Sequence, residues 1–159
     1  MVFLENWFGL LLIFHLLVTF VLVGSMTHQM FVVRDYLRGK FGRQKRDFYY
    51  LKVVLWSYLI CYVIGALIYP AFRIHMRHEY FDVAANNLGW ATGLFEVKEH
   101  WGAVLMALLL ALYCLRRSFQ PSEDKAKLYF YLPMLLVVNL TVWYKVIVGV
   151  YLTSLKGSW

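Results

Sequence analysis

The sequence predicts an all-α integral membrane protein, built as a single four-helix bundle. Of its 159 residues, 62% are hydrophobic and 19% are aromatic, and the mean hydropathy of +0.59 is too high for a soluble domain. Four apolar runs each approach or exceed the ~20 residues that a helix needs to cross a ~30 Å hydrocarbon core. We expect these spans at residues 7–26, 49–72, 94–115 and 128–155. The connections between them are short, so residues 1–159 form one predicted transmembrane domain.

The basic residues are concentrated in two of the three predicted loops. Six lie between the first and second spans and four between the third and fourth, whereas the second loop carries only Arg73 and Arg77. By the positive-inside rule, the first and third loops face the cytoplasm and both termini face outward. Topology and attraction to anionic lipid therefore account for the net charge of +7, and we expect no nucleic-acid partner. The expected location is the bacterial inner membrane.

The first span lacks the features of a cleaved signal peptide and carries a histidine. Only Glu5 precedes the apolar core, whereas a signal peptide would carry Lys or Arg there. We therefore expect residues 7–26 to be retained as a helix. His15 lies near the middle of this span, at membrane depth.

The second span combines small residues at helical spacing with a proline near its end. Ser57, Cys61 and Gly65 recur every four residues, so they share one face of the helix. Pro70 weakens the end of the span. The long loop that follows contains the turn sequence Asn-Asn-Leu-Gly at 86–89, which precedes the third span.

The third span begins near Leu94, because residues 101–115 alone are too short to cross a bilayer. Ala103, Ala107 and Ala111 form a second stripe of small residues along one helix face. Close helix contact in lipid depends on such residues. We predict that this stripe packs against the small residues of the second span.

The fourth span follows a loop with Pro121, and Ser122 is the predicted N-cap of its helix. Lys145 lies in the outer half of this span, where a buried ammonium needs a carboxylate. Glu96 and Glu99 of the third span lie at a similar depth. We predict an ion pair between Lys145 and one of these two residues, joining the third and fourth helices.

Two histidines on different spans, His15 and His100, are candidate ligands of a b-type haem. Helical bundles hold haem between histidines of separate helices. The alternatives for His15 are a proton relay or a hydrogen bond to a neighbouring helix. The chain has no paired histidine motif that distinguishes these roles.

A further group of polar residues lies at the outward-facing end of the bundle. Its imidazoles and carboxylates are of the kind that bind Zn²⁺ or Cu²⁺, which predicts a metal site there. Arg73 and Arg77 would oppose a cation, so a polar juxtamembrane helix or a site for an anionic ligand are the alternatives. The candidate metal ligands are His75, His78, Glu96, Glu99 and His100.

Short segments of three spans carry a family resemblance. The first span contains Phe14-His15-Leu16-Leu17 and then Val23-Gly24, the third opens with Lys98-Glu99-His100-Trp101, and the fourth contains Leu132-Pro133-Met134-Leu135 and later Lys145. These segments resemble four-helix membrane haem proteins of the HemJ-type protoporphyrinogen oxidase and CopD-type kinds. The resemblance implies a bundle that binds haem b, with His15 and His100 as ligand candidates and Lys145 close to a propionate or an anionic substrate.

The leading functional hypothesis is a haem-b-binding or redox-associated membrane protein. It would pass electrons to a quinone or porphyrin, or serve as a small subunit of a redox complex. One alternative is a small ion or metal transporter that uses the outward-facing Glu, His and Lys residues. Another is a structural accessory subunit, held by other membrane subunits or by copies of itself. The chain lacks the common nucleotide, zinc-protease and Ser-His-Asp motifs, so no catalytic residue is assigned, and any enzyme activity would be that of a membrane oxidoreductase.

Overall fold

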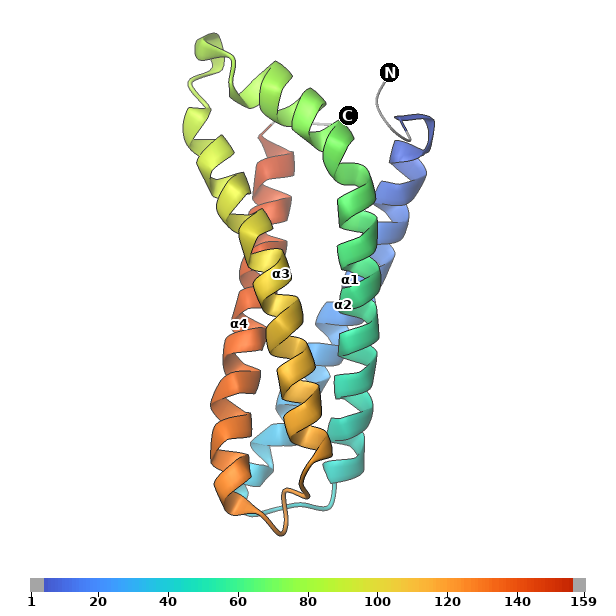
Figure 1. Cartoon of the computed structure of the whole chain (residues 1–159), viewed down its shortest axis with the longest axis vertical. Coiled ribbons are helices and arrows are strands. Elements are labelled where there is room, and N and C mark those ends of the chain that lie inside the picture. Colours follow the sequence, from blue (N-terminus) through green and yellow to red (C-terminus); the bar gives the residue numbers. More distant parts are fainter. Residues whose placement is uncertain (1–4, 156–159) are drawn as a thin grey trace.

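The computed structural model describes residues 5–155, which form four long helices that run up and down in chain order (Figure 1). Each helix is long and apolar enough to cross a membrane. The predicted all-α membrane four-helix bundle is therefore confirmed. The helices are α1 (Phe8–Arg34), α2 (Gln44–Phe72), α3 (Gly89–Arg117) and α4 (Lys125–Ser154).

The helices are longer than the predicted spans. α1 continues past residue 26 to Arg34, and α3 begins at Gly89 instead of near Leu94. With a rise of ~1.5 Å per residue, a helix of this size is about 40–45 Å long. The hydrocarbon core is only ~30 Å thick, so the polar end turns reach the headgroup region on both sides.

The two ends of the bundle differ in structure (Figure 1). One end holds the loops at residues 35–43 and 118–124, and we call it the basic end. The other holds the start of α1, the end of α4 and the connection between α2 and α3, and we call it the elbow end. α1 begins and α4 ends at the same end of the bundle, as the charge pattern predicts.

The elbow end is formed by a bend in α2. The helix continues through Pro70 and then becomes a π-helix, η3 (Arg73–Phe81), which crosses over the end of the bundle (Figure 1). A proline has no N–H for the helical hydrogen bond, which accounts for a change of direction here. The predicted turn at residues 86–89 is confirmed, because Asn87 takes the left-handed conformation with φ of 50°.

Two apolar cores hold the bundle together. The main core fills the half toward the basic end with side chains from all four helices, such as Leu51, Leu105 and Leu135. A smaller core lies at the elbow end, where η3 packs onto α3 and α4. Its buried members are Met76, Phe81, Ala91, Phe95, Val148 and Leu152.

The two stripes of small residues do not pack against each other, so that prediction is wrong. Ala103, Ala107 and Ala111 are all exposed on the outside of α3. α2 turns its small residues toward α1 instead, where Cys61 Sγ lies 3.5 Å from Thr19 Oγ1. α1 packs mainly on α2 and α3 mainly on α4, and the face of α3 that enters the core is its leucine face.

The N-cap of α4 is Asp124, so the prediction of Ser122 is also wrong. The Asp124 carboxylate accepts a hydrogen bond from the backbone N–H of Lys127 at 3.0 Å. Ser122 instead donates its hydroxyl to Gln44 Oε1 at 3.3 Å. A carboxylate at this position also interacts favourably with the helix dipole.

Candidate functional site

Polar side chains from all four helices converge between the two apolar cores. We call this group the interior site. The Tyr58 hydroxyl of α2 contacts the Gly102 carbonyl of α3, and Lys145 of α4 reaches the space beside Gly102. His15 of α1 lies beside Gly65 of α2. The members of the interior site are His15 on α1, Tyr58 on α2, Lys98, Glu99 and Gly102 on α3, and Lys145 on α4.

The ammonium of Lys145 enters the interior beside a glycine. A Cβ atom at Gly102 would lie 3.1 Å from Lys145 Nζ and 3.3 Å from Cε2 of Tyr62, so a side chain at this position would push both groups away. Lys145 Nζ also lies 5.8 Å from the centroid of the Tyr58 ring, within range of a cation–π interaction. The absence of a side chain at Gly102 therefore leaves the space that the ammonium occupies.

Several polar groups of the interior site are satisfied within the chain. The Tyr58 hydroxyl donates to the backbone carbonyl of Gly102 at 2.8 Å, which links α2 to α3. Lys98 Nζ and Glu99 Oε1 form an ion pair at 2.8 Å. Each of these groups therefore has a partner within the chain.

Two cationic or basic groups of the site are not satisfied. The Nδ1 atom of His15 is buried and makes no hydrogen bond of good geometry to a described residue, although the Cys61 backbone interacts with the ring. In the part of the chain that the structure describes, Lys145 has no hydrogen bond and no carboxylate oxygen within 4 Å. The predicted ion pair of Lys145 is therefore wrong, because Glu96 pairs with Arg77 at 2.8 Å and Glu99 pairs with Lys98.

The second predicted haem ligand, His100, lies outside this group. Its side chain is exposed, and its Nδ1 lies 2.7 Å from the backbone carbonyl of Glu96, one turn earlier on α3. The structure therefore brings His15 and Lys145 into the interior and leaves His100 on the surface. A helix places residues that are three or four apart on one face, and α3 turns its Phe95, Gly102 and Leu105 face inward.

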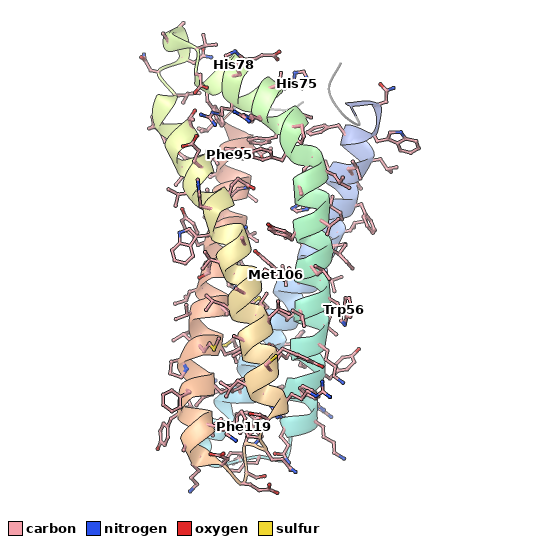
Figure 2. The ribbon with its side chains drawn as sticks, viewed as in Figure 1. Trp56, His75, His78, Phe95, Met106 and Phe119 are labelled. Carbon is pink, nitrogen blue, oxygen red and sulfur yellow. The ribbon has the colours of Figure 1, made fainter. Side chains whose placement is uncertain are left out.

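The predicted metal ligands at the elbow end have separate partners. His75 Nδ1 lies 2.9 Å from Glu79 Oε2 on η3, while Glu96 binds Arg77. Figure 2 places both His75 and His78 on η3 at the elbow end, above the buried Phe95. Within residues 5–155, no three His, Cys, Asp or Glu side chains are grouped so as to hold a metal ion. The zinc or copper site thus stays a prediction.

The sequence did not predict a buried polar network at the basic end. Asp47 on α2 is fully buried, and its carboxylate accepts hydrogen bonds from side chains of the other three helices and of the short helix η2 (Tyr36–Arg38). We call this group the Asp47 network. Among the described residues, its donors are Gln29 Nε2 at 2.9 Å, Tyr36 OH at 3.1 Å, Arg116 Nε at 2.7 Å and Tyr131 OH at 2.7 Å.

Arg116 has a second role in this network. Its remaining guanidinium nitrogens donate to the backbone carbonyls of Phe119 at 3.1 Å and Gln44 at 2.8 Å. The charge pattern counts Arg116 among the basic residues between the third and fourth spans, whereas the residue is only 6% exposed. One signal pointed to this role, because Asp47 is the sole acidic residue between residues 36 and 78 and directly precedes an apolar run.

An apolar layer separates the Asp47 network from the interior site. Among the described residues, most of the side chains buried between the two polar groups are aliphatic or thioether, and Ser57 and Asn139 are buried polar exceptions. Asn139 donates to the Met26 carbonyl at 3.4 Å within this layer, so the layer is predominantly and not wholly apolar. The layer consists of Leu22, Met26, Leu51, Val54, Leu105, Leu109, Leu112, Leu135, Val138 and Val142.

Comparison of the chain with known proteins gives no further identification. No protein-family model, no curated protein and no solved structure matches it. Its function is therefore inferred from its own residues.

Proposed function

We propose that this protein binds a lipophilic redox group with acidic substituents inside the membrane, and that this group is haem b. The observation that carries the proposal is a pair of unpartnered groups in the interior site. His15 Nδ1 is buried without a hydrogen bond, and the Lys145 ammonium has no carboxylate partner among the described residues. Tyr58, Lys98 and Glu99 around them each have a partner in the chain.

The Lys145 ammonium indicates the charge of the ligand. An ammonium has three N–H donors and no acceptor, so a partner must supply acceptor oxygens. A charge at membrane depth is costly, and such residues pair with an opposite charge where they have a function. Lys98 already neutralises Glu99 at 2.8 Å, so the chain offers Lys145 no free carboxylate at this level. A carboxylate of the ligand would supply the missing charge.

The His15 imidazole indicates that the ligand carries an electrophilic centre, such as a metal ion. A buried ring nitrogen without a hydrogen bond is free to bind an electrophile, and the haem iron is a common partner of a membrane histidine. Gly65 lies beside the ring, because a Cβ there would be 3.8 Å from His15 Cε1. His15 would hold the iron of haem b and Lys145 would bind a propionate, so this one ligand would satisfy both groups. When bound, haem supplies one-electron redox chemistry.

The position of His100 limits the proposal to a single histidine ligand. Its exposed ring lies against the Glu96 carbonyl and does not share the interior with His15. A quinone is the competing ligand, because its carbonyl oxygens would accept hydrogen bonds from both Lys145 and His15. Transport of an ion is less favoured than binding of a ligand, since most side chains buried between the interior site and the basic end are apolar.

The visible absorption spectrum of the purified protein tests the proposal. Cells are supplied with a haem precursor, and the protein is purified in mild detergent. We expect a Soret band that His15→Ala removes and that Lys145→Met weakens. His28→Ala is the matched control, because His28 is an exposed histidine on the same helix. His100→Ala should also leave the band unchanged.

The outcomes separate the candidates. A colourless wild-type protein that gains no Soret band when haem is added contradicts haem binding. Quinone in the organic extract of that protein, lost in Lys145→Met, would identify a quinone site in the same place. Retention of neither molecule, with helical circular dichroism and melting temperature intact, would reject the redox proposal and favour the accessory subunit.

A further inference from the structure

A second site, independent of the interior site, lies at the bend of α2. A cavity of about 550 Å³ opens where α2 passes into η3, and it is lined by basic and apolar side chains. We call it the elbow pocket. The residues that matter for its chemistry are Tyr69, Arg73, Ile74, Arg77, His78 and Asp82.

The side chains that line the elbow pocket include two arginines and only one carboxylate, since Glu96 lies outside the lining. Arg77 Nη1 binds Glu96 Oε1 at 2.8 Å, and its Nε lies 3.5 Å from Asp82 Oδ2. Asp82 also accepts a hydrogen bond from the Thr92 hydroxyl at 2.7 Å. The two carboxylates are thus engaged by Arg77. The exposed guanidinium of Arg73 makes no such contact with any residue that the structure describes.

The pocket lies where a lipid headgroup would lie. Arg73 follows the 29 residues of α2, a helix of about 43 Å, which exceeds the hydrocarbon core and brings Arg73 to the headgroup region. Tyr69 and Ile74 line the same cavity and supply an apolar side. A molecule that fits such a cavity carries an anionic group next to an apolar body.

We propose that the elbow pocket binds a phosphate group through Arg73, with an anionic membrane lipid as its source. The planar guanidinium offers two parallel N–H donors that match two phosphate oxygens, and it does so without breaking another contact of the chain. His78, on the next turn of η3, lies at the same cavity and adds a second donor. Arg77 holds Asp82 and keeps its carboxylate occupied.

Native mass spectrometry of the full chain in detergent tests this proposal. Phosphatidylglycerol, with a net negative charge, is compared with phosphatidylcholine, which carries the same phosphate beside a cationic choline. We expect preferential retention of phosphatidylglycerol. Loss of one partly exposed charge-assisted contact should weaken that retention about three- to tenfold in Arg73→Gln. Arg73→Lys should retain more phosphatidylglycerol than Arg73→Gln and less than wild type. Lysine keeps the positive charge but lacks the two parallel N–H donors of the guanidinium.

The controls separate a site from general charge attraction. Arg38→Gln makes the same charge change at the basic end, where Arg38 is exposed, and should leave retention nearly unchanged. Ile74→Glu adds a carboxylate at the pocket and should abolish the preference. Equal retention in Arg73→Gln and wild type, or an equal loss in Arg38→Gln, would overturn the proposal.

A soluble anion is the other possible source of the phosphate. Glycerol phosphate is therefore added in millimolar excess before the lipid. Undiminished phosphatidylglycerol retention supports the lipid as the source. Full displacement by glycerol phosphate, still dependent on Arg73, would keep the phosphate site and reassign its ligand to a soluble molecule.

Discussion

The Asp47 network and the interior site each combine polar groups from all four helices, but they differ in how those groups are satisfied. Every oxygen of the Asp47 carboxylate has donors from the chain, and Arg116 uses all three of its nitrogens; Gln29 Oε1 alone is left without a partner among the described residues. In the interior site, His15 Nδ1 has no hydrogen bond and Lys145 has no carboxylate partner among the described residues. The first group is satisfied almost entirely by the chain, as a structural network is, and the second is where we propose that a ligand binds.

Asp47→Ala should have the largest effect on stability. It leaves the Arg116 guanidinium buried without its carboxylate, and breaking a buried ion pair in this way costs about 3–5 kcal/mol. Thermal unfolding in detergent, followed by circular dichroism, would measure the loss. The double variant Asp47→Leu with Arg116→Leu should recover much of it, because no uncompensated charge remains. An unchanged melting temperature in Asp47→Ala would remove the distinction between the two regions.

Lys145→Met should stabilise the protein, whereas Asp47→Ala destabilises it. A methionine of similar length removes a half-buried ammonium that has no carboxylate within 4 Å among the described residues. We expect the free energy of unfolding to rise by about 1–2 kcal/mol, a discounted share of the cost of a lysine within the membrane. The measurement requires protein stripped of any bound ligand. A loss of stability in that sample would mean that Lys145 serves the fold and not a ligand.

Tyr58→Phe tests the satisfied part of the interior site. The variant removes the hydrogen bond from the Tyr58 hydroxyl to the Gly102 carbonyl and should lower the free energy of unfolding by about 1 kcal/mol. Tyr62→Phe is the matched control, since Tyr62 lies one turn away, is more exposed, and its hydroxyl has no hydrogen bond to a described residue. Equal effects of the two variants would contradict the assigned contact.

A substitution at the N-cap of α4 should have the smallest effect on stability. The backbone N–H of Lys127 holds the pKa of the Asp124 carboxyl below its ordinary value of 3.8. A lowered carboxyl pKa stabilises the folded state above pH 3.8, and this stabilisation is lost as the pH falls through the lowered value. Asp124→Asn should therefore flatten the acid side of the stability profile slightly, while Glu123→Gln should not.

The helices could be predicted from the sequence because the length and apolar character of each run are sufficient to indicate a membrane-spanning helix. A run of this length forms its backbone hydrogen bonds within one helix and needs no information about its neighbours. His15 and Lys145 were found in the same way, since a titratable group inside an apolar run stands out. The contacts of these two residues were not predicted correctly. Glu99, expected to pair with Lys145, pairs with the adjacent Lys98 instead.

Contacts between distant segments were beyond the reach of local patterns. Arg116 stands beside Arg117 at the end of a span, and position alone does not distinguish a solvated arginine from one that binds a carboxylate 69 residues away. The prediction that the alanine stripe of α3 packs against α2 failed for a related reason. Small residues allow close packing but do not require it, and the choice of inner face depends on the neighbouring helices.

The division of the interior into two cores has a consequence for how the molecule opens. The core beneath η3 contains fewer buried side chains than the main core in the described residues, and polar groups interrupt the apolar packing between them. Amide protons of η3 and of the first turns of α3 should therefore exchange with solvent by local separation, at a lower free energy than those around Leu105 and Leu109. Local unfolding of the bundle would then begin at the elbow end, while the helices at the basic end stay packed.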